Sequence, residues 1–276
     1  MPNIVITGST RGIGLGLARG FLERGGRVMV SGRHEETTSA AQDSLAREFG
    51  ADRVFGFPCN VRIPQEVDRL WSRAQEALGA IDIWINNAGF ANDPMPIWDL
   101  DPAQAHAAIE TNLMGAVYGS QTAARGMLAQ GKGAIYNMEG MGGDGRMQAG
   151  LAIYGTSKYA VHYFTLALAK ELKGTGVIAA SLRPGMVATD MIIEPYRGKP
   201  EEWQRVKPIF NIIAERLEVV TPWLVDQILT NNTSDKVISF SSNWKLMLRF
   251  LTSRFRKRDL FADVDISKPG EGEAGT

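Results

Sequence analysis

Tyr154 and Lys158 are the two residues of this chain whose types and spacing best suit proton transfer. They stand four positions apart in Tyr-Gly-Thr-Ser-Lys, a spacing that places both side chains on one face of a helix. A free tyrosine has a pKa of about 10, and a neighbouring ammonium favours the phenolate and lowers that value. The pair therefore predicts a general acid–base group near neutral pH. On its own, the same spacing more often marks two unrelated surface side chains.

A glycine-rich segment near the start of the chain provides a second chemical signal. It reads Thr-Gly-Ser-Thr-Arg-Gly-Ile-Gly, between an apolar strand and a helix. Glycine permits a tight turn and lets backbone N–H groups approach a pyrophosphate, which a helix N-terminus favours electrostatically. The alternative is that these glycines only pack the helix against the sheet. We expect a dinucleotide to contact Gly8, Ser9, Thr10, Arg11, Gly12, Ile13 and Gly14.

Two arginines predict which dinucleotide binds. The second strand ends in Ser-Gly-Arg, so Arg33 occupies the position where an NAD site would place an acidic residue for the ribose 2′-hydroxyl. Together with Arg11 in the glycine turn, Arg33 would attract a 2′-phosphate. The alternative is a pair of solvated surface arginines. We expect NADPH.

The elements that position these residues alternate between short apolar strands and longer helices, as in a doubly wound α/β fold with a parallel sheet. Seven strands are predicted, at Asn3–Thr7, Arg27–Val30, Arg53–Phe57, Ile81–Asn86, Ala134–Met138, Val177–Leu182 and Val237–Phe240. Helices are predicted at Gly12–Arg24, Glu35–Phe49, Pro64–Leu78, Pro102–Ala129 and Thr156–Leu172. We expect a catalytic domain over residues 1–243, with a substrate loop near 190–220, and a C-terminal helical extension over 244–276.

Composition argues against several classes of protein. The chain has 276 residues, and its 30 basic residues balance 30 acidic ones, so no overall charge recruits nucleic acid. Its one cysteine suits a reducing compartment, and its three histidines lack the spacing of a zinc site. We expect no metal, no signal peptide and a cytoplasmic location, with peripheral attachment to a photosynthetic membrane left open.

Further motifs follow the strands in a fixed order. Asn-Asn-Ala-Gly begins at Asn86, Asn112 lies in a long helix, and Pro-Gly-Met-Val-Ala-Thr begins at Pro184. With the glycine turn and the Tyr–Lys pair, this set resembles the short-chain dehydrogenase/reductase family over roughly residues 3–190. The resemblance implies that Tyr154 exchanges the proton, that Lys158 binds the nicotinamide ribose and tunes Tyr154, and that Asn112 holds a water of the proton relay. It also implies cofactor contacts from Asn87, Ala88, Gly89, Pro184, Gly185, Val187 and Thr189.

The chain departs from the family pattern at two places. Asn60-Val61 follows the third strand where the family often has Asp-Val, and we expect the Asn60 oxygen still to accept from the adenine amino group. Glu139-Gly140 replaces the Ser-Ser pair after the fifth strand, so the usual hydroxyl for the reacting carbonyl is missing. A protonated Glu139, a backbone N–H or the substrate itself must then replace it.

This second departure narrows the resemblance to one group. The Asn-Met-Glu-Gly loop, with the segments around Asp82–Gly89, Pro184–Asp190 and Phe210–Glu215, is similar to chlorophyll(ide) b reductases. That similarity implies reduction of the C7-formyl group of chlorophyll b or chlorophyllide b with NADPH. Glycines between Gly140 and Gly150 leave room for a broad ligand, and nearby methionines are equally consistent with an apolar lining and with ordinary core. The alternatives are reduction of another bulky apolar carbonyl compound, and a protein that senses NADPH without turnover.

The end of the chain suggests contacts beyond the active site. Trp244, Met247, Leu248, Leu251 and Phe255 recur at helical spacing, with basic residues at Lys245, Arg249, Arg254, Arg256, Lys257 and Arg258. This pattern indicates either a basic amphipathic helix for an anionic membrane or partner, or a helix packed on the body. Residues 268–276 are predicted to be disordered. In the family, the helices at Pro102–Ala129 and Thr156–Leu172 pair subunits, which implies a homodimer or homotetramer.

Overall fold

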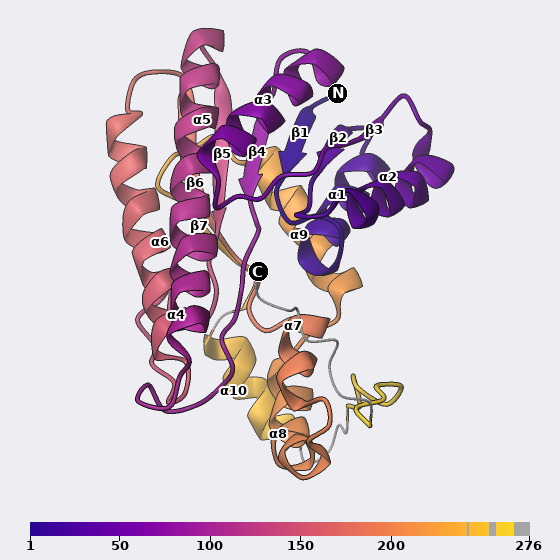
Figure 1. Cartoon of the computed structure of the whole chain (residues 1–276), viewed down its shortest axis with the longest axis vertical. Coiled ribbons are helices and arrows are strands. Elements are labelled where there is room, and N and C mark those ends of the chain that lie inside the picture. The colour runs from indigo at the N-terminus through magenta and orange to yellow at the C-terminus, as the bar shows by residue number, and fades with distance from the viewer. Residues whose placement is uncertain (242, 254–257, 268–276) are drawn as a thin grey trace.

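A computed structural model describes residues 1–241, 243–253 and 258–267. Seven strands form one parallel sheet in the order β3-β2-β1-β4-β5-β6-β7 (Figure 1). The strands are β1 (Asn3–Ile6), β2 (Arg27–Val30), β3 (Val54–Gly56), β4 (Ile83–Asn86), β5 (Gly133–Met138), β6 (Val177–Arg183) and β7 (Val237–Ser239). The order reverses between β1 and β4, the switch point at which doubly wound folds bind ligands. The predicted fold class and strand number are confirmed.

Helices cover both faces of the sheet. One face carries α1 (Gly12–Glu23), α2 (Glu35–Phe49) and α9 (Leu217–Thr230), and the other carries α3 (Pro64–Leu78), α5 (Gly115–Gln130) and α6 (Ala152–Glu171). Strand residues alternate between these two cores: Ile4 and Ile6 pack with the first group, and Val5 with the second. Every residue of β4 is buried, as expected for a strand covered on both faces.

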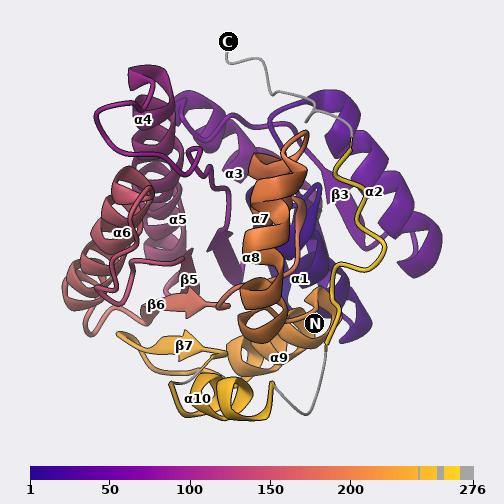
Figure 2. The same cartoon turned by 90° about the horizontal axis from the view of Figure 1, so that it is seen from below.

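The region predicted as a substrate loop near 190–220 is mostly helical. It forms α7 (Asp190–Ile193), the short 3₁₀ segment Glu194–Tyr196 and α8 (Pro200–Ile213). Figure 2 shows α7 and α8 across the end of the sheet, with α10 (Asn243–Thr252) beside β7. Trp203 and Phe261 pack edge to face with their ring centroids 5.3 Å apart, so α8 has a small apolar core of its own with the segment 258–267.

The long helix predicted at Pro102–Ala129 is interrupted. It consists of α4 (Pro102–Ile109), a π-helical turn at Glu110–Met114 and α5. The other four predicted helices are present, with α6 starting earlier than predicted. Phe255, Arg254, Arg256, Lys257 and the predicted disordered tail lie outside the described residues.

Candidate active site

The glycine turn after β1 is locked to the end of β4. Gly8 has a φ of +61°, and a Cβ there would lie 2.7 Å from the Cα of Ala88, so this approach requires glycine. The Asn87 side-chain amide donates to the carbonyl oxygens of Thr7 (3.0 Å) and Gly8 (2.7 Å). The Thr7 hydroxyl accepts from the backbone N–H groups of Asn87 and Ala88, both at 3.1 Å. The structure thus brings together three residues predicted to contact the cofactor.

The loop after β6 reaches the same turn. A Cβ at Gly12 would lie 3.7 Å from the methyl group of Thr189. Val187 is buried and forms an isolated parallel bridge with Glu215, which fixes the loop that begins at Pro184 and Gly185. A Cβ at Gly14 would lie 2.3 Å from the Gly8 carbonyl oxygen, so the first turn of α1 stays close to the glycine turn.

The segments that follow β2 and β3 carry further residues predicted to contact the cofactor. A Cβ at Gly32 would lie 2.4 Å from the Thr10 side chain, which places Arg33 beside the turn that carries Arg11. Both arginines are exposed. The side-chain oxygen of Asn60 accepts from the backbone N–H of Arg62 at 3.2 Å. A carbonyl oxygen has two lone pairs, so the predicted contact between Asn60 and the adenine would use the second.

Tyr154 and Lys158 face each other on α6. The Lys158 ammonium nitrogen lies 5.8 Å from the centre of the Tyr154 ring and donates to the Met138 carbonyl oxygen at 3.1 Å. Burial raises the pKa of Tyr154 to about 12 and lowers the pKa of Lys158 to about 8. The predicted fall in the Tyr154 pKa is therefore wrong for this structure, because removal of the phenol from water disfavours its charged form.

The π-helical turn positions Asn112. The Asn112 side-chain oxygen accepts from the Phe90 N–H at 2.7 Å, and its amide donates to the Phe90 carbonyl oxygen at 2.9 Å and to the Ser157 hydroxyl at 2.9 Å. Ser157 in turn donates to the Tyr154 carbonyl oxygen at 2.7 Å. A Cβ at Gly89 would lie 3.4 Å from the Asn112 oxygen and 3.6 Å from the Lys158 nitrogen. Asn112 therefore ties the loop after β4 to the helix that carries the Tyr–Lys pair, at the kind of site where π-helical turns often occur.

Asn92 is a site residue that the sequence motifs did not indicate. Its side-chain oxygen accepts from the Tyr154 N–H at 3.2 Å, and its amide donates to the Gly150 carbonyl oxygen at 3.3 Å. It is buried, so these bonds replace lost contacts with water. Asn92 fixes the first turn of α6 and the end of the glycine-rich loop together. In the sequence, Asn92 lies six positions beyond Asn86 and outside the Asn-Asn-Ala-Gly motif.

Gly140 explains why a serine is missing. A Cβ at this position would lie 2.3 Å from the Tyr154 hydroxyl oxygen, 3.0 Å from the ring carbon that bears it, and 3.3 Å from Cγ of Lys158. The phenol thus occupies the space that a side chain would need.

Glu139 points into a separate cluster. One carboxylate oxygen accepts from Arg183 at 2.8 and 2.5 Å, and the other lies 2.7 Å from Nδ1 of His162. The hypothesis that a protonated Glu139 donates to the substrate does not fit this arrangement, because both oxygens are engaged by neighbouring side chains and the arginine fork matches a carboxylate. No sequence motif marks Arg183 or His162, although His162 lies one helical turn beyond Lys158.

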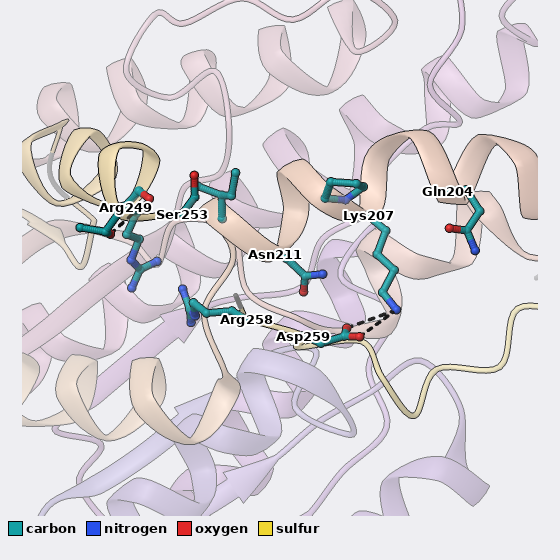
Figure 3. Close-up of a pocket in the computed structure, with 10 residues that line it drawn as sticks. Gln204, Lys207, Asn211, Arg249, Ser253, Arg258 and Asp259 are labelled. Carbon is teal, nitrogen blue, oxygen red and sulfur yellow. Dashed lines mark hydrogen bonds and ion pairs between the residues drawn. The ribbon is translucent and has the colours of Figure 1, made fainter. Parts of the chain in front are cut away.

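Two cavities lie around α8. One of about 240 Å³ lies between Pro94 of the loop after β4 and the segment from Pro195 to Val206. A larger one of about 800 Å³ lies between α8 and α10, and Figure 3 shows Lys207, Asn211, Arg249, Arg258 and Asp259 around it. None of the predicted site residues lines the larger cavity, so its size does not make it the active site.

Comparisons with known proteins agree with this geometry. The family model for short chain dehydrogenases matches residues 2–199. The chain is 37% identical to the chlorophyll(ide) b reductase NOL of Arabidopsis thaliana, over 95% of this chain and 73% of that protein. It is 32% identical to the probable chlorophyll(ide) b reductase NYC1 of the same plant, again over 95% of this chain but only 55% of that protein. Both relatives are named as chloroplastic. The chain thus spans about half the length of the NYC1 protein.

Solved structures give the same result. A variant of actinorhodin polyketide ketoreductase with NADPH has a TM-score of 0.77 and 28% identity, covering 86% of this chain and 94% of that one. Serine dehydrogenase complexed with NADP+ has a TM-score of 0.75 and 26% identity, covering 85% and 93%. By family match, relatives and fold, the chain belongs to the short-chain dehydrogenase/reductase family and is a nicotinamide-dependent oxidoreductase.

Proposed function

We propose that this protein uses NADPH to reduce the C7-formyl group of chlorophyll b or chlorophyllide b to hydroxymethyl. The observation that carries the proposal is the replacement of the family's serine pair by Glu139-Gly140, in a site that keeps Tyr154, Lys158 and Asn112. Similarity to NOL and NYC1 supports the same substrate. Chromatography of the pigments after incubation with NADPH tests it directly.

The residues present fit a dinucleotide. The Gly8 turn approaches Ala88, in the loop after β4, too closely for any side chain, and Arg11 and Arg33 are exposed beside this turn. Backbone N–H groups at the start of α1 would hold the pyrophosphate, and the two arginines the 2′-phosphate. When bound, NADPH supplies the hydride for the reduction.

The chain's own residues manage the proton. In this proposal, Tyr154 donates its phenolic proton to the carbonyl oxygen as negative charge develops there. The Lys158 ammonium stabilises the phenolate that remains, and Asn112 keeps α6 in register with the loop after β4. With no side chain at Gly140, Tyr154 meets the developing charge without the family's second hydroxyl. A conjugated macrocycle can delocalise part of that charge, which favours a pigment over a small aldehyde.

Cofactor choice provides a direct test of Arg33. Arg33→Ala should weaken NADPH binding roughly tenfold to a hundredfold and leave NADH binding nearly unchanged, because charge-assisted hydrogen bonds to the 2′-phosphate are worth about 1.5–3 kcal/mol. Titration of both cofactors, with Arg47→Ala on α2 as a matched control, measures this. Equal weakening of NADPH and NADH binding would show that Arg33 does not select between the two cofactors.

Two other functions make different predictions. A reductase of another bulky apolar carbonyl compound would oxidise NADPH with that compound and leave chlorophyll b unchanged. A protein that only senses NADPH would bind it tightly and turn over none of these substrates. The intact Tyr154, Lys158 and Asn112 arrangement favours a catalyst over a sensor.

We further propose that α10 contacts an anionic membrane surface. Trp244, Met247, Leu248 and Leu251 are all exposed although they recur at helical spacing, and residues 243–258 contain six basic and no acidic side chains. On its other side, α10 is held to the body by an ion pair between Arg249 and Glu215. Among the described residues, no helix is long and apolar enough to cross a membrane. The arrangement suits a helix lying in the membrane interface.

Vesicle binding tests this contact. The protein should sediment with anionic vesicles, less so at high salt because exposed charges are screened. The double variant Trp244→Ala/Leu251→Ala should lose that binding without unfolding, since both side chains are exposed, whereas Val219→Ala on α9 should keep it. Unchanged sedimentation of the double variant would show that this face of α10 does not contact the membrane.

Exposed apolar and aromatic side chains on α5 and α6 are consistent with pairing of subunits through these helices. Leu128, Tyr159 and Tyr163 are exposed on these two helices, and we propose that they pair subunits in a homodimer or homotetramer. Sedimentation equilibrium giving a monomer mass would contradict this.

A further inference from the structure

A buried charge cluster lies next to the chain segment that contacts Lys158. It joins Glu139 after β5, Arg183 at the end of β6 and His162 on α6, and the Glu139 side chain is fully buried. The side chains of Arg183 and His162 are only 19% and 22% exposed. Burying a carboxylate and its partners costs several kcal/mol of desolvation and seldom adds net stability. A role at the active site would account for such a cluster.

The backbone on both sides of Glu139 lies close to Lys158. The carbonyl oxygen of Met138 accepts from the Lys158 ammonium at 3.1 Å, and a Cβ at Gly140 would lie 3.3 Å from Cγ of Lys158. The Glu139 N–H donates to the Leu182 carbonyl oxygen at 2.8 Å, which holds this segment to β6. Arg183 also donates to the Gly143 carbonyl oxygen at 3.2 Å, so the cluster anchors the start of the glycine-rich loop.

The negative charge of Glu139 also counteracts the effect of burial on the pKa of Lys158. Burial lowers the pKa of Lys158, and the negative charge of Glu139 raises it. On α6 itself the neighbouring titratable groups are Tyr154 and His162. The groups on α4 and the π-helical turn, His106 and Glu110, pair with each other at 3.0 Å, and Glu110 also pairs with Arg62 at 2.5 Å.

We propose that Glu139, clamped by Arg183 and His162, is a positioning residue that keeps Lys158 in its ammonium form and in place against the end of β5. The inference rests on the proposed reductase function for its catalytic consequence, but the charge state of Lys158 can be measured without any substrate. In this proposal Glu139, which precedes the position of the family's missing serine, acts through Lys158 and not by contact with the carbonyl group of the substrate.

The sign of the effect follows from the charges. The ammonium form of Lys158 is present below its pKa of about 8 and is lost as pH rises through it. Glu139→Gln removes the opposing negative charge and leaves Arg183 uncompensated, so this loss should occur at a pH lower by about one unit or more. Arg183→Gln leaves Glu139 less neutralised and should move the Lys158 midpoint in the opposite direction.

The experiment is a titration of the lysine side chains by NMR, with ¹³C at Cε, in the cofactor-free protein. Lys158→Arg identifies the Lys158 signal, and a thermal melt confirms that each variant is folded. We expect a lower midpoint in Glu139→Gln, a higher one in Arg183→Gln, and no change in Glu215→Gln, a matched control whose carboxylate is also held by two arginines.

Unchanged Lys158 midpoints in folded Glu139→Gln and Arg183→Gln would overturn the proposal. If Glu139→Gln does not fold, the upward shift in Arg183→Gln decides alone. Where turnover is measurable, the alkaline limb of the rate profile should move with the midpoint, so that Glu139→Gln recovers activity at lower pH. A loss of equal size at every pH would indicate a purely structural role. Failure to reduce pigment affects the proposed function only, since the titration needs no pigment.

Discussion

Tyr154→Phe should lower turnover about 10²–10⁴-fold while leaving the fold and NADPH binding intact, as is typical for loss of a general acid. The Tyr154 backbone N–H donates to the Asn92 side chain at 3.2 Å, and the Lys158 ammonium nitrogen lies 5.8 Å from the centre of the Tyr154 ring. Because burial raises the Tyr154 pKa to about 12, the phenol is protonated throughout the neutral range and can act as an acid. Lys158→Ala should cause a loss of the same order, since the phenolate left after proton transfer would lose its counter-charge.

Single-turnover oxidation of NADPH measures this loss, with a thermal melt and a cofactor titration as controls on each variant. Near-normal turnover in Tyr154→Phe would contradict the assigned proton donor. A matching fall in NADPH affinity would instead indicate a defect in cofactor binding.

Gly140→Ser, which restores the family's hydroxyl, should lower turnover about 10²-fold instead of raising it. The new Cβ would lie 2.3 Å from the Tyr154 hydroxyl oxygen, so the phenol must move, and a displacement of about 1 Å can cost 10²-fold in rate. Gly140→Ala should lose about as much, because the clash comes from Cβ and not from the hydroxyl. Gly155→Ala is the matched control: its Cβ would meet nothing closer than 4.0 Å.

Turnover assays of these three variants test whether a side chain at position 140 displaces Tyr154 or whether the site lacks a hydroxyl that it needs. Higher activity in Gly140→Ser than in the parent protein would show that the site lacks a hydroxyl that it needs.

Local patterns in the sequence accounted for most of the fold. Apolar runs such as Ile4–Ile6 occur where the sheet is covered on both faces, and glycines mark turns with positive φ, as at Gly8. These signals depend on neighbours in the chain, so they can be recognised without tertiary structure. The order of motifs along the chain then placed the glycine turn beside Asn87 correctly.

Features that depend on long-range contacts were not predictable. The π-helical turn at Glu110–Met114 has no local marker in the sequence. The pairing of Glu139 with Arg183 joins residues 44 positions apart, and the direction of the Tyr154 pKa shift depends on burial by several elements at once. Helices α8 and α9 contain Pro208 and Pro222, which obscured their helical pattern.

The most direct test of the proposed function is incubation of the purified protein with NADPH and chlorophyll b or chlorophyllide b, followed by chromatography of the pigments. We predict conversion of the C7-formyl pigment to its hydroxymethyl form, absent with Tyr154→Phe, and poor turnover of small aliphatic aldehydes. Rapid turnover of small aldehydes with both pigments unchanged would contradict the assignment.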